Sequence, residues 1–153
     1  LTEVVRGFND GPRIAIELEP GILSSVGSLD DMRQLAIQID RRPDLNTRVG
    51  FNCDVAHWTI AGIQPDNVVD PNVLSRIYHA HLSDTGKGHI CDLIPGTVMS
   101  ESMIRKWICF IQTAVKANGG NFGASLELEY SAQGEDVARA VSFLESIGVD
   151  FLG

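Results

Sequence analysis

Residues 13–43 read RIAIELEPGILSSVGSLDDMRQLAIQIDRRP, and this stretch contains the signals of one strand, one loop and one helix. Residues 13–19 are rich in β-branched and other apolar side chains and stop at Pro20, as a strand does. Ser28 offers an N-cap followed by acidic residues in the first turn, and apolar residues then recur at helical spacing until Pro43. The stretch therefore predicts one β-loop-α unit.

The same order of strand, loop and helix recurs along the rest of the chain. Further strands are predicted at 49–55, 77–83 and 124–129, and further helices open at Asp70-Pro71, after Ser100, and near residue 135, the last ending near residue 147. Strands that alternate with helices in this way predict a parallel sheet with right-handed crossovers. A complete (β/α)8 barrel takes about 250 residues. The 153 residues therefore allow a small doubly wound sheet or half of a barrel.

Composition excludes several classes of protein. Twenty acidic residues against twelve basic ones give a net charge of −8, which disfavours nucleic acid as a partner. Three cysteines with no C-x-x-C spacing predict neither a disulfide framework nor a cysteine zinc site, so we expect a reducing, cytoplasmic location. No apolar run approaches the roughly 18 residues of a membrane-spanning helix, so we expect no membrane partner.

Every predicted strand ends in ionisable side chains. These are Glu17 and Glu19, then Asp54, then His79 and His81 with Asp84, and finally Glu127 and Glu129. In parallel α/β folds ligands bind at the carboxyl ends of the strands, so these side chains are expected to converge on one mouth. Carboxylate oxygens and imidazole nitrogens together predict a site for a divalent metal ion: Mg²⁺, Mn²⁺, Co²⁺ or Zn²⁺.

The histidines support this prediction because all four lie in or just after the second and third strands. Each Glu-Leu-Glu pair leaves a choice, since a period of two puts both carboxylates on one face. We favour the inner positions, Glu17 and Glu127, as ligands, with Glu19 and Glu129 as the alternatives.

Four short motifs, one in each predicted βα unit, resemble strands five to eight of the xylose-isomerase-like barrels. This is the sugar isomerase/epimerase superfamily, which also contains the endonuclease IV type of apurinic-site nuclease. The motifs are Ile-Glu-Leu-Glu-Pro-Gly (16–21), Asp-Val-Ala-His (54–57), His-Ala-His-Leu-Ser-Asp (79–84) and Leu-Glu (126–127). The resemblance covers nearly the whole chain. It implies an α/β fold, a (β/α)4 half of a TIM barrel, in which residues 1–153 form a single domain.

The resemblance also implies roles for particular residues. In the ketose 3-epimerase branch the matching residues bind one divalent metal, and here they are Glu17, Asp54, His81 and Glu127. The two glutamates would also be the catalytic acid and base. His57 would contact substrate, and Lys87 or His89 would replace an arginine that the family often carries in its Gly-rich loop. Trp58 could form an apolar wall against the substrate or pack in the core.

The function implied is a divalent-metal-dependent isomerase or epimerase of a sugar or another polyhydroxy carbonyl compound. A metal held by carboxylates and histidine can acidify the C–H next to a carbonyl and stabilise the enediolate that results. One alternative is an endonuclease IV-like nuclease, but residues 88–92 lack the Asp-Arg-His tripeptide of that branch. Another is a non-catalytic half-barrel.

Strands one to four of the family have no counterpart in this chain. We therefore expect a complementary half-barrel chain, a longer precursor or a homo-oligomer, because an isolated half would leave its sheet edges open.

Overall fold

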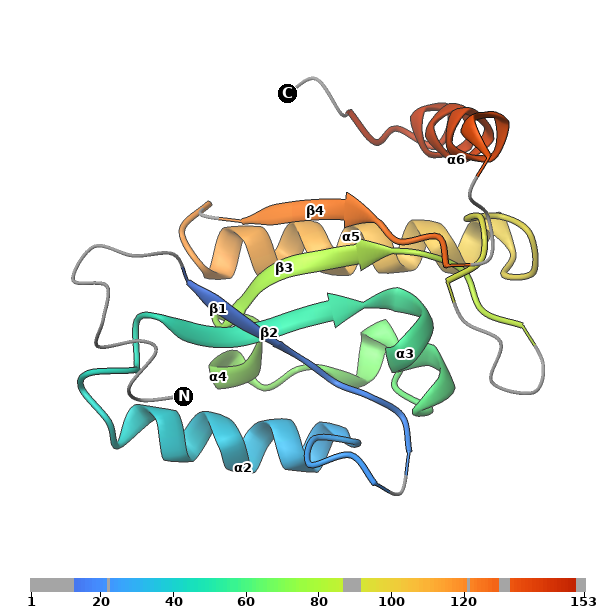
Figure 1. Ribbon diagram of the computed structural model, residues 1–153. Coiled ribbons are helices and arrows are strands. Elements are labelled where there is room, and N and C mark those ends of the chain that lie inside the picture. Colours follow the sequence, from blue (N-terminus) through green and yellow to red (C-terminus); the bar gives the residue numbers. More distant parts are fainter. Residues whose placement is uncertain (1–12, 22, 87–91, 121, 130–132, 151–153) are drawn as a thin grey trace.

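Four parallel strands form one sheet in the order in which they occur along the chain (Figure 1). The computed structural model describes residues 13–21, 23–86, 92–120, 122–129 and 133–150. The strands are β1 (Ile14–Glu17), β2 (Val49–Asp54), β3 (Ile77–Leu82) and β4 (Gly123–Leu126), and every neighbouring pair is parallel. A doubly wound sheet reverses its strand order at a switch point, whereas a barrel does not. The predicted α/β half-barrel architecture is therefore confirmed.

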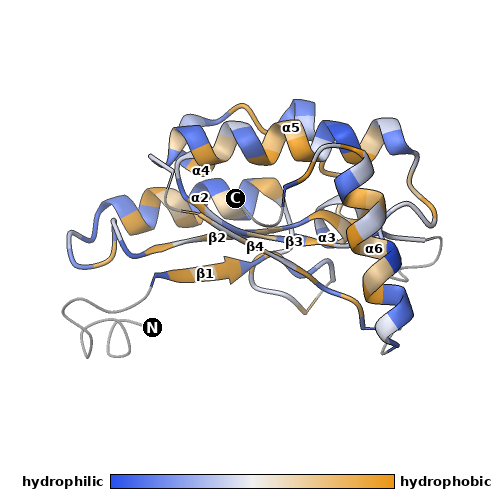
Figure 2. Cartoon of the chain, turned by 90° about the horizontal axis from the view of Figure 1, so that it is seen from above, coloured by the Kyte–Doolittle hydropathy of each residue, from blue (hydrophilic) through white to orange (hydrophobic). Residues whose placement is uncertain are grey.

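Helices follow each strand along the chain. They are α2 (Leu29–Asp40), α3 (Val55–Ile60), the 3₁₀ turn η1 (Pro65–Asn67), α4 (Pro71–Leu74), α5 (Glu101–Ala117) and α6 (Gly134–Ser146). Seen along the sheet, α2, α4 and α5 lie together on the same side (Figure 2). The predicted caps are present: Ser28 Oγ accepts a hydrogen bond from Asp31 N, and Ser100 Oγ accepts one from Met103 N.

The short helix α3 was not predicted. It begins directly after β2 and is capped by Asp54, whose Oδ1 accepts a hydrogen bond from the backbone N–H of His57 at 2.7 Å. The sequence prediction extended the strand through Val55 and placed a loop after it, so Val55 is the first helical residue rather than the last strand residue. This helix turns the chain sharply at the carboxyl end of the sheet, where the ionisable residues gather.

The apolar core lies between the sheet and its helices. The sheet contributes Phe51, Cys53, Ile77 and Ala80, and the helices contribute Met32, Ala36, Trp58, Trp107 and Ile111. Trp58 is fully buried, and its ring lies 6.1 Å from that of Trp107 and 5.9 Å from that of Phe110. The expectation that Trp58 could form a wall against substrate is therefore wrong, and the alternative, a packing role in the core, is correct.

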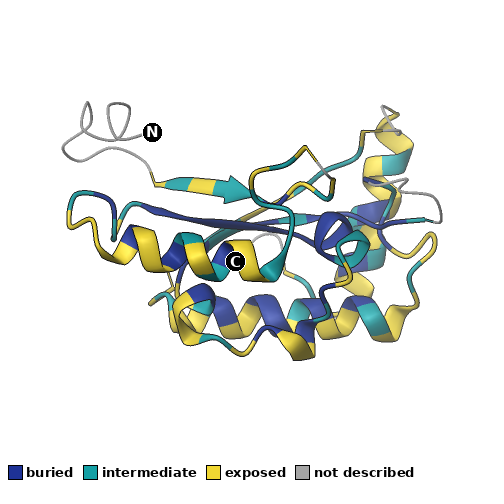
Figure 3. Cartoon of the chain, turned by 90° about the horizontal axis from the view of Figure 1, so that it is seen from below, coloured by how far each residue is buried: buried dark blue, intermediate teal, exposed yellow. Residues whose placement is uncertain are grey.

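The opposite face of the sheet is polar. Residues that alternate with the core residues along the strands point to this side, and they include Glu17, Asn52, Asp54, His79, His81 and Ser125. All six residues of β2 are buried, including the polar ones, and β2 appears as a continuous buried stripe between its neighbours (Figure 3). In a closed barrel this face would be the interior, so the half-barrel carries its polar groups where a barrel carries its ligands.

A glycine on β4 makes room for a side chain of β3. Gly123 faces His79 across the β3–β4 pair, and a Cβ at this position would lie 2.9 Å from His79 Nδ1. The glycine therefore leaves room for an imidazole on the polar face.

Within the described ranges, no helix is long and apolar enough to span a bilayer.

Candidate metal centre

Four side chains from four successive strand ends meet at one point. They are Glu17, Asp54, His81 and Glu127, and each offers a ligand atom within 4.8 Å of the others. His81 Nδ1 lies 3.4 Å from Glu17 Oε2 and 3.4 Å from Asp54 Oδ2, and it contacts Glu127 Oε2 directly. The structure thus brings together the four residues that the sequence singled out as ligands, and this group can hold a metal ion.

Parallel register explains why these residues meet. Asp54 is paired with His81 across β2 and β3, and Glu17 is at the level of Asn52 on the other side of β2. Glu127 directly follows Leu126, the last residue of β4, whose register partner is next to His81. Because parallel strands end at the same edge of a sheet, residues at matched ends are brought within side-chain reach.

Helix α3 fixes the carboxylate of Asp54. Its Oδ1 caps the helix, as described above, and Ser83 Oγ lies 3.5 Å from the same oxygen. Oδ2 is therefore turned toward the cluster. A single aspartate thus both starts the helix and presents one oxygen to the site.

A bound cation would satisfy the buried carboxylate oxygens of the cluster better than protons alone. Asp54 Oδ2 and Glu127 Oε2 are buried, and neither accepts a hydrogen bond from any residue that the structure describes. Both face His81 Nδ1, but one imidazole nitrogen carries at most one hydrogen and cannot satisfy several carboxylate oxygens. Buried charges without partners are costly, whereas a bound cation would satisfy all of them together.

Electrostatics within the cluster divide the four groups into two pairs. Burial raises the pKa of Glu127 to about 7, and the nearby Asp54 and Glu17 carboxylates act in the same direction. The nearby Asp54 carboxylate raises the pKa of His81, although burial opposes it. When no cation is present, both Glu127 and His81 therefore bind a proton more tightly than they do in water.

Glu17 and Asp54 behave in the opposite way. Burial would raise the pKa of both, but hydrogen bonds outweigh it: His57 and Asn52 lower the pKa of Glu17, and His81 and the backbone N–H of His57 lower that of Asp54. These two carboxylates are ionised at neutral pH and give the cluster its permanent negative charge.

His57 lies at the rim of the cluster. Its Nδ1 is 3.0 Å from Glu17 Oε1 and 3.6 Å from Glu19 Oε1, and its Nε2 is 3.9 Å from Asp92 Oδ2. The hydrogen bond with Glu17 is the main reason why the pKa of His57 rises to about 9. The resemblance assigned His57 to substrate contact, and the structure places it beside the ligands rather than among them.

The remaining predicted residues are distributed as follows. Glu19 lies outside the four-residue cluster, with a side chain that is 62% exposed, and Glu129 is exposed as well. His79 is hydrogen-bonded to Ser125 Oγ at 3.0 Å and packs edge-on against the His81 ring. Lys87 and His89, the candidate substrate-binding residues of the Gly-rich loop, lie outside the described residues.

Asp84 has a different role from the one its position suggested. Its buried carboxylate accepts hydrogen bonds from the backbone N–H groups of Thr85, Val98 and Met99. It does not join the ligand cluster but ties together the two ends of the loop that follows β3. In that loop Asp92 has a positive φ of 59° and lies beside His57, which sequence reasoning did not anticipate.

Asn52 was also missed. Its Nδ2 donates to Glu17 Oε2 at 2.8 Å and lies 3.0 Å from His81 Nδ1, so it touches two of the four candidate ligands. A signal was present in the sequence, because an asparagine is unusual in the middle of a buried, otherwise apolar strand.

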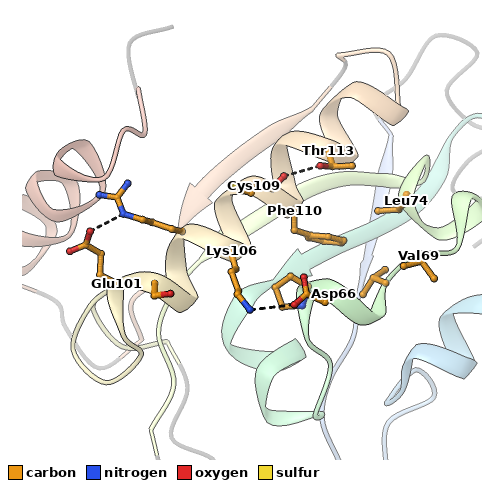
Figure 4. Close-up of a pocket in the computed structure, with 12 residues that line it drawn as sticks. Asp66, Val69, Leu74, Glu101, Lys106, Cys109, Phe110 and Thr113 are labelled. Atoms are coloured by element: carbon orange, nitrogen blue, oxygen red, sulfur yellow. Dashed lines mark hydrogen bonds and ion pairs between the residues drawn. The ribbon is translucent and has the colours of Figure 1, made fainter.

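One hollow on the surface lies away from the metal centre. It is on the helical side of the molecule, between η1, α4 and α5, and is lined by Leu74, Phe110 and Cys109 among others (Figure 4). Lys106 and Asp66 form an ion pair of 3.3 Å across its rim. None of the candidate ligands lines it, so this hollow is not part of the metal centre.

Comparisons of the chain with protein-family models, with curated proteins and with solved structures find no match. Because no known protein indicates the chemistry of the site, we infer it from the donor atoms of the site. Three carboxylates and one imidazole, held at the carboxyl end of a parallel sheet, form a compact set of oxygen and nitrogen donors.

Proposed function

We propose that this chain carries the metal centre of a divalent-metal-dependent isomerase or epimerase that acts on a sugar or a related polyhydroxy carbonyl compound. The observation that supports the proposal is the convergence of Glu17, Asp54, His81 and Glu127 from four successive strand ends. Oxygen and nitrogen donors of this kind suit Mn²⁺, Mg²⁺, Co²⁺ or Zn²⁺. The resemblance of the four motifs to strands five to eight of the xylose-isomerase-like barrels points the same way.

A divalent ion, when bound, supplies Lewis-acid stabilisation of negative charge on neighbouring carbonyl and hydroxyl oxygens. The chain's own residues would then move the proton. Glu17 belongs to β1 and Glu127 follows β4, so the two carboxylates approach the centre from the two outer strands of the sheet. One removes the proton from the carbon next to the carbonyl group, and the other returns it from the opposite side.

His57 would orient the substrate from the rim of the site. It is close to Glu17 and to Asp92, and its side chain is only 9% exposed. A protonated imidazole beside Glu17 can donate a hydrogen bond to a substrate hydroxyl group. The partner implied for catalysis is a small polyhydroxy compound, and the polar face of the sheet would be closed by a complementary half-barrel or by a second copy of the chain.

The test is exchange of the substrate's α-proton with solvent deuterium, followed by NMR for a panel of ketoses and inososes. We expect exchange that depends on added Mn²⁺ or Co²⁺ and that stops on chelation. Glu127→Gln should slow exchange by about 100-fold or more while weakening substrate binding little, because the amide keeps the shape but cannot accept a proton. Glu129→Gln, at the exposed position of the same Glu-Leu-Glu pair, is the matched control and should exchange normally.

Two other outcomes would contradict the proposal. Metal-dependent cleavage of abasic DNA, with no exchange into any polyhydroxy carbonyl compound, would favour a nuclease of the endonuclease IV kind. Absence of both activities from a metal-loaded preparation that contains a complete barrel would favour a non-catalytic half-barrel.

A further inference from the structure

Asn52 occupies the centre of the polar face directly beneath the candidate ligands. It is 3% exposed and lies on β2, between the strands that carry Glu17 and His81. Its Nδ2 is 2.8 Å from Glu17 Oε2 and 3.0 Å from His81 Nδ1. A single amide group therefore reaches two ligands that belong to two different strands.

This arrangement leaves the other end of the amide unsatisfied. Asn52 Oδ1 is buried and accepts no hydrogen bond from any described residue. A buried acceptor without a partner lowers the stability of the folded state. An apolar residue of similar size would avoid that cost in a strand whose neighbours are Phe51 and Cys53. Asn52 thus lowers the stability of the fold, but it supplies an N–H donor to the site.

Glu17 is the ligand that Asn52 can hold in place. It ends a four-residue edge strand, and its side chain is 26% exposed. Its two oxygens have different neighbours, because Oε1 faces His57 Nδ1 at 3.0 Å and Oε2 faces Asn52. Asp54, by comparison, is held by the N-terminus of α3.

We infer that Asn52 is a positioning residue of the metal centre, which holds Glu17 Oε2 toward the point where the four ligand atoms meet. A carboxylate oxygen has lone pairs for an amide hydrogen and a cation at the same time, so this bond can persist when an ion binds. A bound ion would use the lone pair of deprotonated His81 Nδ1, so the contact between Asn52 Nδ2 and this nitrogen is not part of the positioning. The inference rests on the metal site of the proposed function and is independent of its proton-transfer chemistry.

The experiment measures Co²⁺ binding to the whole chain by titration, together with the visible spectrum of the bound ion. Asn52→Leu keeps the approximate size and removes the N–H donors, and we expect a Kd about 10- to 100-fold weaker. The Co²⁺ spectrum should change in the same way as it does in Glu17→Gln. Ser125→Ala is the matched control, because Ser125 lies on the same face and bonds to His79 but not to the cluster.

A double-mutant cycle separates positioning from a general structural effect. If Asn52 acts through Glu17, then adding Asn52→Leu to Glu17→Gln should weaken Co²⁺ binding hardly further, whereas the effects of Asn52→Leu and Asp54→Asn should be closer to additive. Asn52→Val, whose β-branched side chain suits a strand and has no donor, serves as a second variant if the leucine variant does not fold.

The outcomes are distinct. An unchanged Kd and spectrum in folded Asn52→Leu or Asn52→Val, or full additivity with Glu17→Gln, would overturn the inference and leave the metal centre standing. Absence of Co²⁺ binding by the unmodified chain would overturn the metal centre and this inference together. Normal Co²⁺ binding with the expected Asn52 effect but no proton exchange would support the inference and contradict only the proposed enzymatic function.

Discussion

Metal binding at this cluster should release protons, and its affinity should fall as the pH is lowered. The perturbation is a change of pH from 8 to 6 in the absence of substrate. A cation competes with protons for the same atoms, since both His81 and Glu127 must lose their protons before they can act as ligands. The pKa of Glu127 is about 7 and that of His81 lies above its ordinary value.

The size of this pH effect on the Kd depends on how many protons the cation must displace. Glu17 and Asp54 have lowered pKa values, so they carry no proton in this range and contribute nothing to the pH dependence. Well below pH 7 the two other groups both hold protons, so the Kd should rise toward roughly 100-fold for each pH unit there. Above pH 7 Glu127 is mostly ionised, and the dependence should fall to about tenfold per unit or less.

Calorimetric titration with Co²⁺ in two buffers of different ionisation enthalpy gives the number of protons released per ion. Glu127→Gln should release about one proton fewer at pH 6, because the amide has no proton to lose. Glu129→Gln should release the same number as the unmodified chain. If the affinity were independent of pH and no proton were released, the cation would bind away from His81 and Glu127, and the assignment of the ligands would be wrong.

Two further predictions concern the fold. Trp58→Ala should lower the free energy of unfolding by about 3–5 kcal/mol, as measured by chemical denaturation, because the ring is fully buried against Trp107 and Phe110; Val69→Ala, at a 71% exposed position, should change it little. Sedimentation should report a species larger than 16.6 kDa, because β1 and β4 each pair on one side only within the described residues; a clean monomer at micromolar concentration would contradict this.

The positions of strands and ligands could be predicted from sequence because they depend on local patterns. Runs of β-branched residues between turn-forming residues located all four strands to within a few residues, and the ionisable residues followed from where those runs end. The choice between a doubly wound sheet and a half-barrel could not be made from these patterns. Strand order is a property of contacts between distant segments, and only the observed order β1-β2-β3-β4 decides it.

Helix α3 shows why the roles of His57 and Trp58 were harder to predict. The resemblance implied that His57 contacts the substrate, and for Trp58 a wall against the substrate and a packing role in the core were both left open. Successive residues of an α-helix point about 100° apart. In this helix His57 therefore faces Glu17, while Trp58 turns into the core against Trp107. The prediction treated these residues as a loop, in which no such rotation is imposed.

The way in which each carboxylate ligand is held bears on which of them moves a proton. Asp54 is fixed by the N-terminus of α3, and Glu17 by Asn52 on one oxygen and His57 on the other. Glu127 Oε2 accepts no hydrogen bond from the described residues, although it is buried and in contact with His81 Nδ1. Without a cation its pKa is about 7, whereas that of Glu17 is lowered. A carboxylate that exchanges a proton with substrate needs an oxygen that its protein neighbours leave free, and Glu127 Oε2 is less engaged than either oxygen of Glu17. Of the two glutamates, Glu127 therefore has the environment better suited to the proton carrier, which is why its substitution is the sharper test of the proposed chemistry.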